Sequence, residues 1–258
     1  MKRIQCLMLT LALPAGAIMA GQRVQETRSL SSGGTVSIEN IAGSVTVIGW
    51  DRDEVGIDGS LGNEGDVLEV QGDEGRLSIE VVFDDRKQRN LAGSDLEIRV
   101  PRGARLEIET VSAGITISEF EGQIEAESVS GAIDIKGRPR RVELSTVSSH
   151  IDCRIDGRLG EGEFESVSGR IQFEGDLSTG GDFDFETVSG PIELILPAGV
   201  AADFDVSTFS GSISNDFGFH AEKTSQYLPS KELTFSVGGG GARVSAETLS
   251  GSIRIMHR

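Results

Sequence analysis

The chain has 258 residues and a formal net charge of −17, with 41 acidic residues against 24 Lys and Arg. Phosphates of nucleic acids and anionic membrane surfaces repel so acidic a protein, which makes both improbable partners. Only 2 cysteines are present, so the sequence also excludes a disulfide-rich scaffold.

The first 20 residues have the layout of a cleavable secretory signal. Lys2 and Arg3 precede an apolar run that ends in small residues. The run spans about 15 residues and contains Pro14, so it is shorter than the roughly 20 residues of a membrane-spanning helix. We expect cleavage after Ala20 or Ala17, giving an exported protein of the periplasm, outer cell surface or exterior, with no transmembrane anchor left.

Residues 21–34 are predicted to be an N-terminal extension, and residues 35–258 a single domain. Segment 35–50 predicts an opening turn with Ile41 as its anchor, Ala42 and Gly43 at a corner, and Val45 directed inward. Alternating apolar residues then indicate strands that would cap the open end of the domain, so that residues 35–100 form the opening turn and cap. These strands are expected at 54–59, 67–70, 76–83 and 95–100.

From residue 106 the chain repeats one phrase seven times, of which ETVSGPIEL is one copy. Each copy carries an apolar anchor after its first Ser or Thr, and the anchors are 18, 18, 20, 21, 21 and 40 residues apart. A fixed period of this kind indicates stacked repeats. The anchors, expected to form an inner row, are Val111, Val129, Val147, Val167, Val188, Phe209 and Leu249.

Each copy predicts two short strands joined by a corner. Apolar residues alternate before the anchor, as at Phe183 and Phe185, and again after it, as at Ile192 and Leu194. The Ser-Gly between them suits a sharp bend, because glycine lacks Cβ and serine can hydrogen-bond the turned backbone. The predicted corner residues are Ser130, Gly131, Ser168, Gly169, Ser189, Gly190, Ser210, Gly211, Ser250 and Gly251.

These features predict an all-β fold: a parallel β-solenoid, or β-helix, of about 18–21-residue turns with an N-terminal β cap. The general chirality of parallel connections favours a right-handed coil. Regular repeats would occupy residues 101–258. Residues 215–241 interrupt them, either as a degenerate turn with an inserted loop or as a protruding excursion.

The repeats resemble a known family. Val100-Pro101-Arg102-Gly103, its echo Leu196-Pro197-Ala198-Gly199 and the recurrent T/S-V-S-G-x-I motif are similar to the bacterial "putative adhesin" family of secreted β-strand-repeat proteins, a domain of unknown function. The resemblance covers about residues 35 to 255 and implies a secreted or cell-envelope protein. Its motifs are structural, so they imply a fold and no catalytic residue.

No catalytic residue and no cofactor site is predicted. The chain has no G-x-S-x-G or H-E-x-x-H motif, and its acidic residues recur as a regular ladder rather than as an unrepeated cluster. Cys153 occupies a slot that other copies fill with Ile or Phe, which favours an inert buried thiol over a reactive one. The basic run 136–141 would neutralise neighbouring carboxylates through Arg138, Arg140 and Arg141, or recognise an anionic glycan. Arg86, Lys87 and Arg89 form a smaller basic loop with the same ambiguity.

Outward carboxylates of the first strands are expected to stack into ladders. Either they form a solubilising face, or they hold weakly bound Ca²⁺, which favours clustered carboxylate oxygens, or they meet a basic partner. The candidate cation-binding ladder is Glu107, Glu125, Glu143, Glu163, Asp184 and Asp205. A second column would run Glu109, Glu127, Ser145, Glu165, Glu186 and Ser207.

The sequence therefore predicts a non-catalytic, monomeric interaction or adhesion-type scaffold of the envelope, whose partner is an envelope protein or glycan. The alternative is a carbohydrate-binding or polysaccharide-active protein on a β-helix scaffold.

Overall fold

The computed structural model describes residues 22–83, 92–225 and 227–258, and these fold as β-strands, turns and loops. The expected signal at residues 1–20 and the basic loop of Arg86, Lys87 and Arg89 lie outside the described residues. Across the part of the chain that the structure describes, no helical segment has the length and apolarity that crossing a membrane requires.

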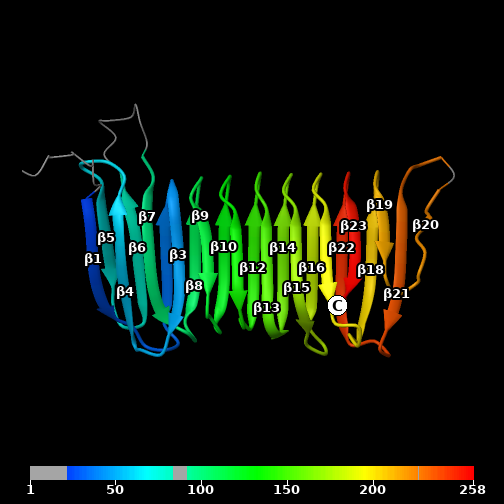
Figure 1. Cartoon of the computed structure of the whole chain (residues 1–258), viewed down its shortest axis with the longest axis horizontal. Coiled ribbons are helices and arrows are strands. Elements are labelled where there is room, and N and C mark those ends of the chain that lie inside the picture. Colours follow the sequence, from blue (N-terminus) through cyan, green and yellow to red (C-terminus); the bar gives the residue numbers. More distant parts are fainter. Residues whose placement is uncertain (1–21, 84–91, 226) are drawn as a thin grey trace, which may run out of the picture.

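Within those ranges the strands form one 11-stranded and one 12-stranded sheet, which run together along the long axis of the molecule (Figure 1). In spatial order, the 11-stranded sheet contains β1 (Gln22–Ser29), β4 (Glu54–Leu61), β7 (Ser94–Pro101), β3 (Gly43–Trp50), β9 (Gly114–Ser118), β11 (Ile133–Gly137), β13 (Ile151–Leu159), β15 (Ile171–Leu177), β17 (Ile192–Leu196), β23 (Ser252–His257) and β19 (Ser212–Asn215). The 12-stranded sheet contains β20 (Glu222–Lys223), β21 (Lys231–Val237), β18 (Ala202–Thr208), β22 (Ala242–Thr248), β16 (Asp182–Thr187), β14 (Glu161–Ser166), β12 (Arg141–Thr146), β10 (Gln123–Ser128), β8 (Arg105–Thr110), β2 (Thr35–Asn40), β6 (Arg76–Val82) and β5 (Val67–Gly72).

The predicted all-parallel β-solenoid is wrong. Both sheets are mixed, because β4 pairs antiparallel with β1 and β7, β5 with β6, and β21 with β18 and β20. The sheets are two open layers over a shared core, which is a β-sandwich rather than a coil closed by parallel turns. Repeats in the middle of the chain give one strand to each layer and pair parallel with their neighbours, whereas unrepeated strands at both ends reverse direction.

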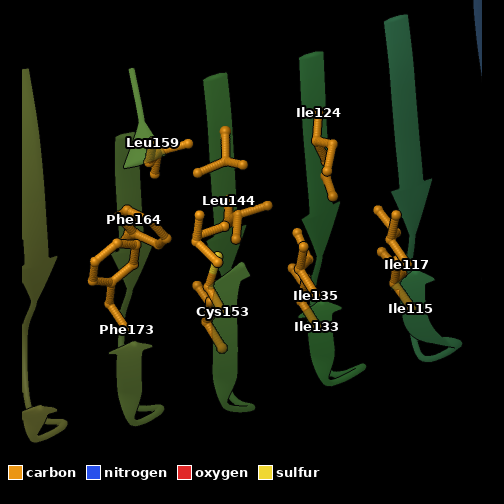
Figure 2. Packing of buried hydrophobic residues seen from close by; sticks show 14 of the residues in the cluster. Ile115, Ile117, Ile124, Ile133, Ile135, Leu144, Cys153, Leu159, Phe164 and Phe173 are labelled. Carbon is orange, nitrogen blue, oxygen red and sulfur yellow. The ribbon is translucent and has the colours of Figure 1, made fainter. Parts of the chain in front are cut away.

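The alternation read from the repeats is confirmed for the core. Phe183 and Phe185 of β16 and Ile192 and Leu194 of β17 are buried, as are the equivalent residues of the other copies. Figure 2 shows Cys153 in line with Ile133 and Ile135 in the same packed layer. Burial of this continuous apolar layer is the main source of stability, at about 25 cal/mol per Å² removed from water.

The strands expected around residues 54–100 are present at one end of the sandwich, as β4, β5, β6 and β7. The extension at residues 21–34 contributes β1, which pairs along its whole length with β4 and had no strand signal in the sequence reading. At the other end, the irregular stretch 215–241 contains β20 and β21, and β21 lies antiparallel to β18.

The last repeat does not lie at the end of the molecule. Strand β22 pairs parallel with β16 on one side and with β18 on the other, so the C-terminal copy is inserted between two earlier copies. Its partner β23 lies between β17 and β19 in the same way (Figure 1). Along the chain β18 comes first, and β21 then pairs antiparallel with one of its edges. Strand β22 follows and pairs with the other edge of β18, between β18 and β16.

Candidate functional site

The repeated T/S-V-S-G motif builds the corner that joins the two sheets. In the copy after β16, the amide of Gly190 donates a hydrogen bond to the Thr187 hydroxyl at 3.0 Å. The Gly131 amide bonds Ser128 in the same way, and the Gly169 amide bonds Ser166, both at 2.8 Å. The first Ser or Thr of the motif is buried and closes the bend.

Glycine is required at these corners for close approach rather than for positive φ. A Cβ on Gly190 would lie 1.7 Å from the carbonyl oxygen of Gly169, and one on Gly169 would lie 1.5 Å from that of Ser149. Neither residue is among the described glycines with positive φ. The serine that precedes each of these glycines faces outward. The hydroxyls of Ser168 and Ser189 donate hydrogen bonds to backbone carbonyl oxygens of the neighbouring copy.

The prediction that the anchors form a buried inner row is wrong. Their side chains are between 40% and 54% exposed, although their backbones continue the parallel hydrogen bonding from copy to copy. The cause is the strand alternation itself, since Thr187 points inward and the next residue must point outward. In spatial order this apolar column consists of Ile41, Val111, Val129, Val147, Val167, Val188, Leu249 and Phe209.

A row of carboxylates runs beside the apolar column, two residues earlier on each strand. Two residues of a strand span about 6.8 Å, and neighbouring strands lie about 4.8 Å apart, so column and row are parallel tracks across the 12-stranded sheet. Both line one groove with a volume of about 1050 Å³. This carboxylate row consists of Glu80, Glu39, Glu109, Glu127, Glu165, Glu186 and Glu247, with Ser145 and Ser207 in the remaining places.

The predicted cation-binding ladder forms a third track farther from the column. Glu107, Glu125, Glu143, Glu163 and Asp184 pair in register, but Ser245 of the inserted β22 separates Asp184 from Asp205. We call the five paired residues the outer ladder.

Arginines of the same sheet neutralise much of the outer ladder. Arg76 lies 2.6 Å from Glu107, Arg105 lies 3.0 Å from Glu125, and Arg141 pairs with Glu143 and, at 2.7 Å, with Glu161. Among the described residues, no carboxylate of the row beside the apolar column forms an ion pair. The two acidic tracks therefore differ: arginines form ion pairs with most of the outer ladder, and no such ion pair is found for the carboxylate row among the described residues.

Burial and neighbouring like charges raise the pKa of two carboxylates of this sheet, Glu186 in the carboxylate row and Glu163 in the outer ladder. Partial burial, and then the neighbouring carboxylates of Glu165 and Glu247, raise the pKa of Glu186 above the ordinary value of a glutamate. Partial burial and the carboxylates of Glu165, Glu143 and Asp184 likewise raise the pKa of Glu163, with Arg141 opposing the shift.

Other candidate residues are placed away from the groove. Cys153 is buried, and burial raises the pKa of its thiol, as expected for an inert side chain. Of the basic run, Arg141 pairs with acidic neighbours as predicted, while Arg138 and Arg140 form no ion pair among the described residues. In the described part of the chain, no group of 3 or more His, Cys, Asp or Glu residues is arranged to hold a metal ion, so calcium binding stays a prediction.

Comparisons with known proteins found similarity to solved structures alone. No protein-family model matches the chain, and no curated protein sequence matches it. A putative adhesin from Parabacteroides distasonis is 12% identical, with a TM-score of 0.41 over 92% of this chain and 98% of that chain. A putative adhesin from Bacteroides fragilis is 12% identical, with a TM-score of 0.40 over 92% and 97%. A putative cell adhesion protein from Clostridium sporogenes is 9% identical, with a TM-score of 0.32 over 92% and 100%.

The chain is similar to proteins named as adhesins.

Sequence reasoning found the acidic columns and missed the apolar one. The anchors were recognised as a repeated apolar position and were assigned to the core because apolar residues are usually buried. The alternation of side chains along the strand indicates the opposite. Leu106, Ile108 and Thr110 point inward, so the next residue, Val111, must point outward.

Proposed function

We propose that this protein is a non-catalytic, exported interaction protein of the cell envelope, and that the apolar column is the surface with which it holds its partner. The observation that carries the proposal is the exposure of Ile41, Val111 and their equivalents along one groove. Soluble proteins rarely expose contiguous apolar surface, and where they do it marks an interaction site.

Repetition strengthens this reading of the apolar column. A single exposed valine needs no explanation, whereas the same corner position carries Val, Ile, Leu or Phe in every copy. A polar β-branched residue such as Thr would satisfy the strand equally well at these exposed positions. The apolar choice therefore serves contact with something outside the chain. The secretory layout of residues 1–20 supports the proposed export.

The test is the binding of a neutral apolar dye, N-phenyl-1-naphthylamine, to the wild type and to a variant with Val129→Thr, Val147→Thr, Val167→Thr and Val188→Thr. We expect the variant to lose most of the dye fluorescence and to keep its melting temperature, because these side chains are exposed. A matched control, Tyr227→Thr with Leu228→Thr, removes exposed apolar surface from the irregular stretch and should leave dye binding unchanged.

Unchanged dye binding in the fourfold Val→Thr variant would contradict the proposal. Turnover of polyuronides by the purified chain would contradict the non-catalytic assignment.

A further inference from the structure

The carboxylate row is the part of the groove whose negative charges form no ion pair within the described residues. Carboxylates of the outer ladder have Arg76, Arg105 and Arg141 beside them, yet within the described ranges no cation pairs with Glu127, Glu165 or Glu186. Neighbouring strands put Glu165 and Glu186 about 4.8 Å apart, where like charges repel, while Ser145 separates Glu127 from Glu165. Partial burial, and then the carboxylates of Glu165 and Glu247, raise the pKa of Glu186.

Resting on the function proposed above, we propose that the groove binds a cationic amphipathic polypeptide segment, whose apolar side chains lie on the apolar column and whose Lys or Arg side chains lie on the carboxylate row. Each Lys or Arg side chain that reaches the carboxylate row places a positive charge beside a carboxylate and so offsets the repulsion between neighbouring carboxylates. Each apolar side chain on the column removes exposed surface from water on both partners.

The dimensions of the groove suit such a segment. From Ile41 to Phe209 the apolar column crosses strand to strand in steps of about 4.8 Å, which gives a length of about 34 Å. An α-helix of about 22 residues has this length, and its turns recur every 5.4 Å, close to the step of the column. A helix laid along a groove anchors through residues at i, i+3, i+4 and i+7. The column and row are about 6.8 Å apart, so one helix can cover both.

The negative charge of the groove favours a cationic polypeptide over the other partners that an apolar groove can bind. A second copy of this chain, docked groove to groove, would bring one carboxylate row against another. An anionic lipid surface would meet the same repulsion. A cationic polypeptide is attracted along the whole groove, and at physiological salt the screening length of about 8 Å still exceeds the distance from row to column.

The test is titration of the full chain with a synthetic peptide of about 22 residues that places leucines on one helical face and lysines on the other. Two matched peptides complete the set: one with glutamates in place of the lysines, and one with serines in place of the leucines. We expect the leucine-lysine peptide to bind at about 0.15 M salt, and both matched peptides to bind at least about tenfold more weakly, since one loses the ion pairs and the other the apolar contact.

Two charge-matched variants locate the site. The row variant carries Glu127→Gln, Glu165→Gln and Glu186→Gln, and should weaken binding about tenfold through the loss of about three ion pairs. The control carries Asp152→Asn, Glu174→Gln and Glu193→Gln on β13, β15 and β17 of the other sheet, and should bind as the wild type does. Melting curves of both variants, with the single variant Glu165→Gln beside them, separate weakened binding from misfolding.

Equal weakening by both variants would overturn the proposal, because binding would then follow net charge alone. Equal affinity for the glutamate peptide would overturn the proposal of a cationic segment and leave the apolar column as a binding surface. Dye binding without any peptide binding would also overturn this proposal and leave the column as a binding surface. Loss of dye response together with absence of peptide binding would overturn the proposed function itself. Association of two copies in sedimentation, or binding to anionic vesicles in preference to the peptide, would assign the groove to another occupant.

Discussion

Thr187 and Gly190 close one corner of the sandwich through a hydrogen bond of 3.0 Å, in which the glycine amide donates to the buried threonine hydroxyl. In the equivalent copy, where Ser149 stands in place of glycine, the Oγ1 of Thr146 is buried without a hydrogen-bond partner. Two threonines at the same position of the repeat therefore have opposite energetic roles.

Thr187→Val should lower the free energy of unfolding by about 1–3 kcal/mol, because it leaves a buried amide without an acceptor. Thr146→Val removes a hydroxyl that is buried without a partner, so it should be neutral or stabilising. Urea unfolding of both variants measures the difference. Equal losses would show that the hydroxyls contribute through packing alone.

Gly190→Ala should be strongly destabilising, by at least about 3 kcal/mol, because the new Cβ would lie 1.7 Å from the backbone oxygen of Gly169 and backbone cannot move aside as a flexible side chain can. Gly199→Ala is the matched control, since a Cβ there meets nothing within 4 Å. Thermal unfolding of the two variants checks this, and a Gly190→Ala protein as stable as the control would refute the close approach of the copies.

Val167→Ala should change the free energy of unfolding by no more than about 0.5 kcal/mol, because the side chain is exposed. Ile171→Ala, four residues later and fully buried, should cost about 2–5 kcal/mol. Denaturant unfolding distinguishes them. A large loss at Val167 would mean that the apolar column belongs to the core.

Glu186→Gln should raise stability at neutral pH. The folded protein holds the pKa of Glu186 above its unfolded value, so the folded state binds more protons and the contribution of this group to stability falls as pH rises through that interval. The gain from Gln should therefore be present at pH about 7 and should vanish below the unfolded pKa of about 4.3. Melting temperatures across this range test the sign, and a variant less stable than wild type at neutral pH would reverse it.

The alternation of side chains was readable from sequence because each copy repeats it, so Phe183, Phe185, Ile192 and Leu194 were assigned to the core correctly. The pairing partners were not readable in the same way. All copies offer nearly the same strand edges, so nothing in residues 242–258 reveals that β22 pairs with β16 rather than extending the stack beyond β18.

The repeat pattern could not predict the strand directions at the two ends of the sandwich either. Residues 22–29 contain few apolar residues, and β1 is formed by backbone pairing with β4 rather than by burial. Periodicity reports which face of a strand is buried, and it carries no information about whether a neighbour runs parallel or antiparallel. The parallel prediction was therefore extended from the middle copies to segments where it does not hold.

The most direct measurement of the account is the rate of maleimide labelling at Val147→Cys, with and without the leucine-lysine peptide. Cys153 is buried and provides a silent background once Cys6→Ser removes the other thiol. Thr116→Cys, on the exposed face of the other sheet, is the control. The account predicts fast labelling at both positions, and peptide at about ten times its dissociation constant should slow labelling about tenfold at Val147→Cys alone. Labelling at Val147→Cys as slow as at Cys153, or equal slowing at both positions, would contradict it.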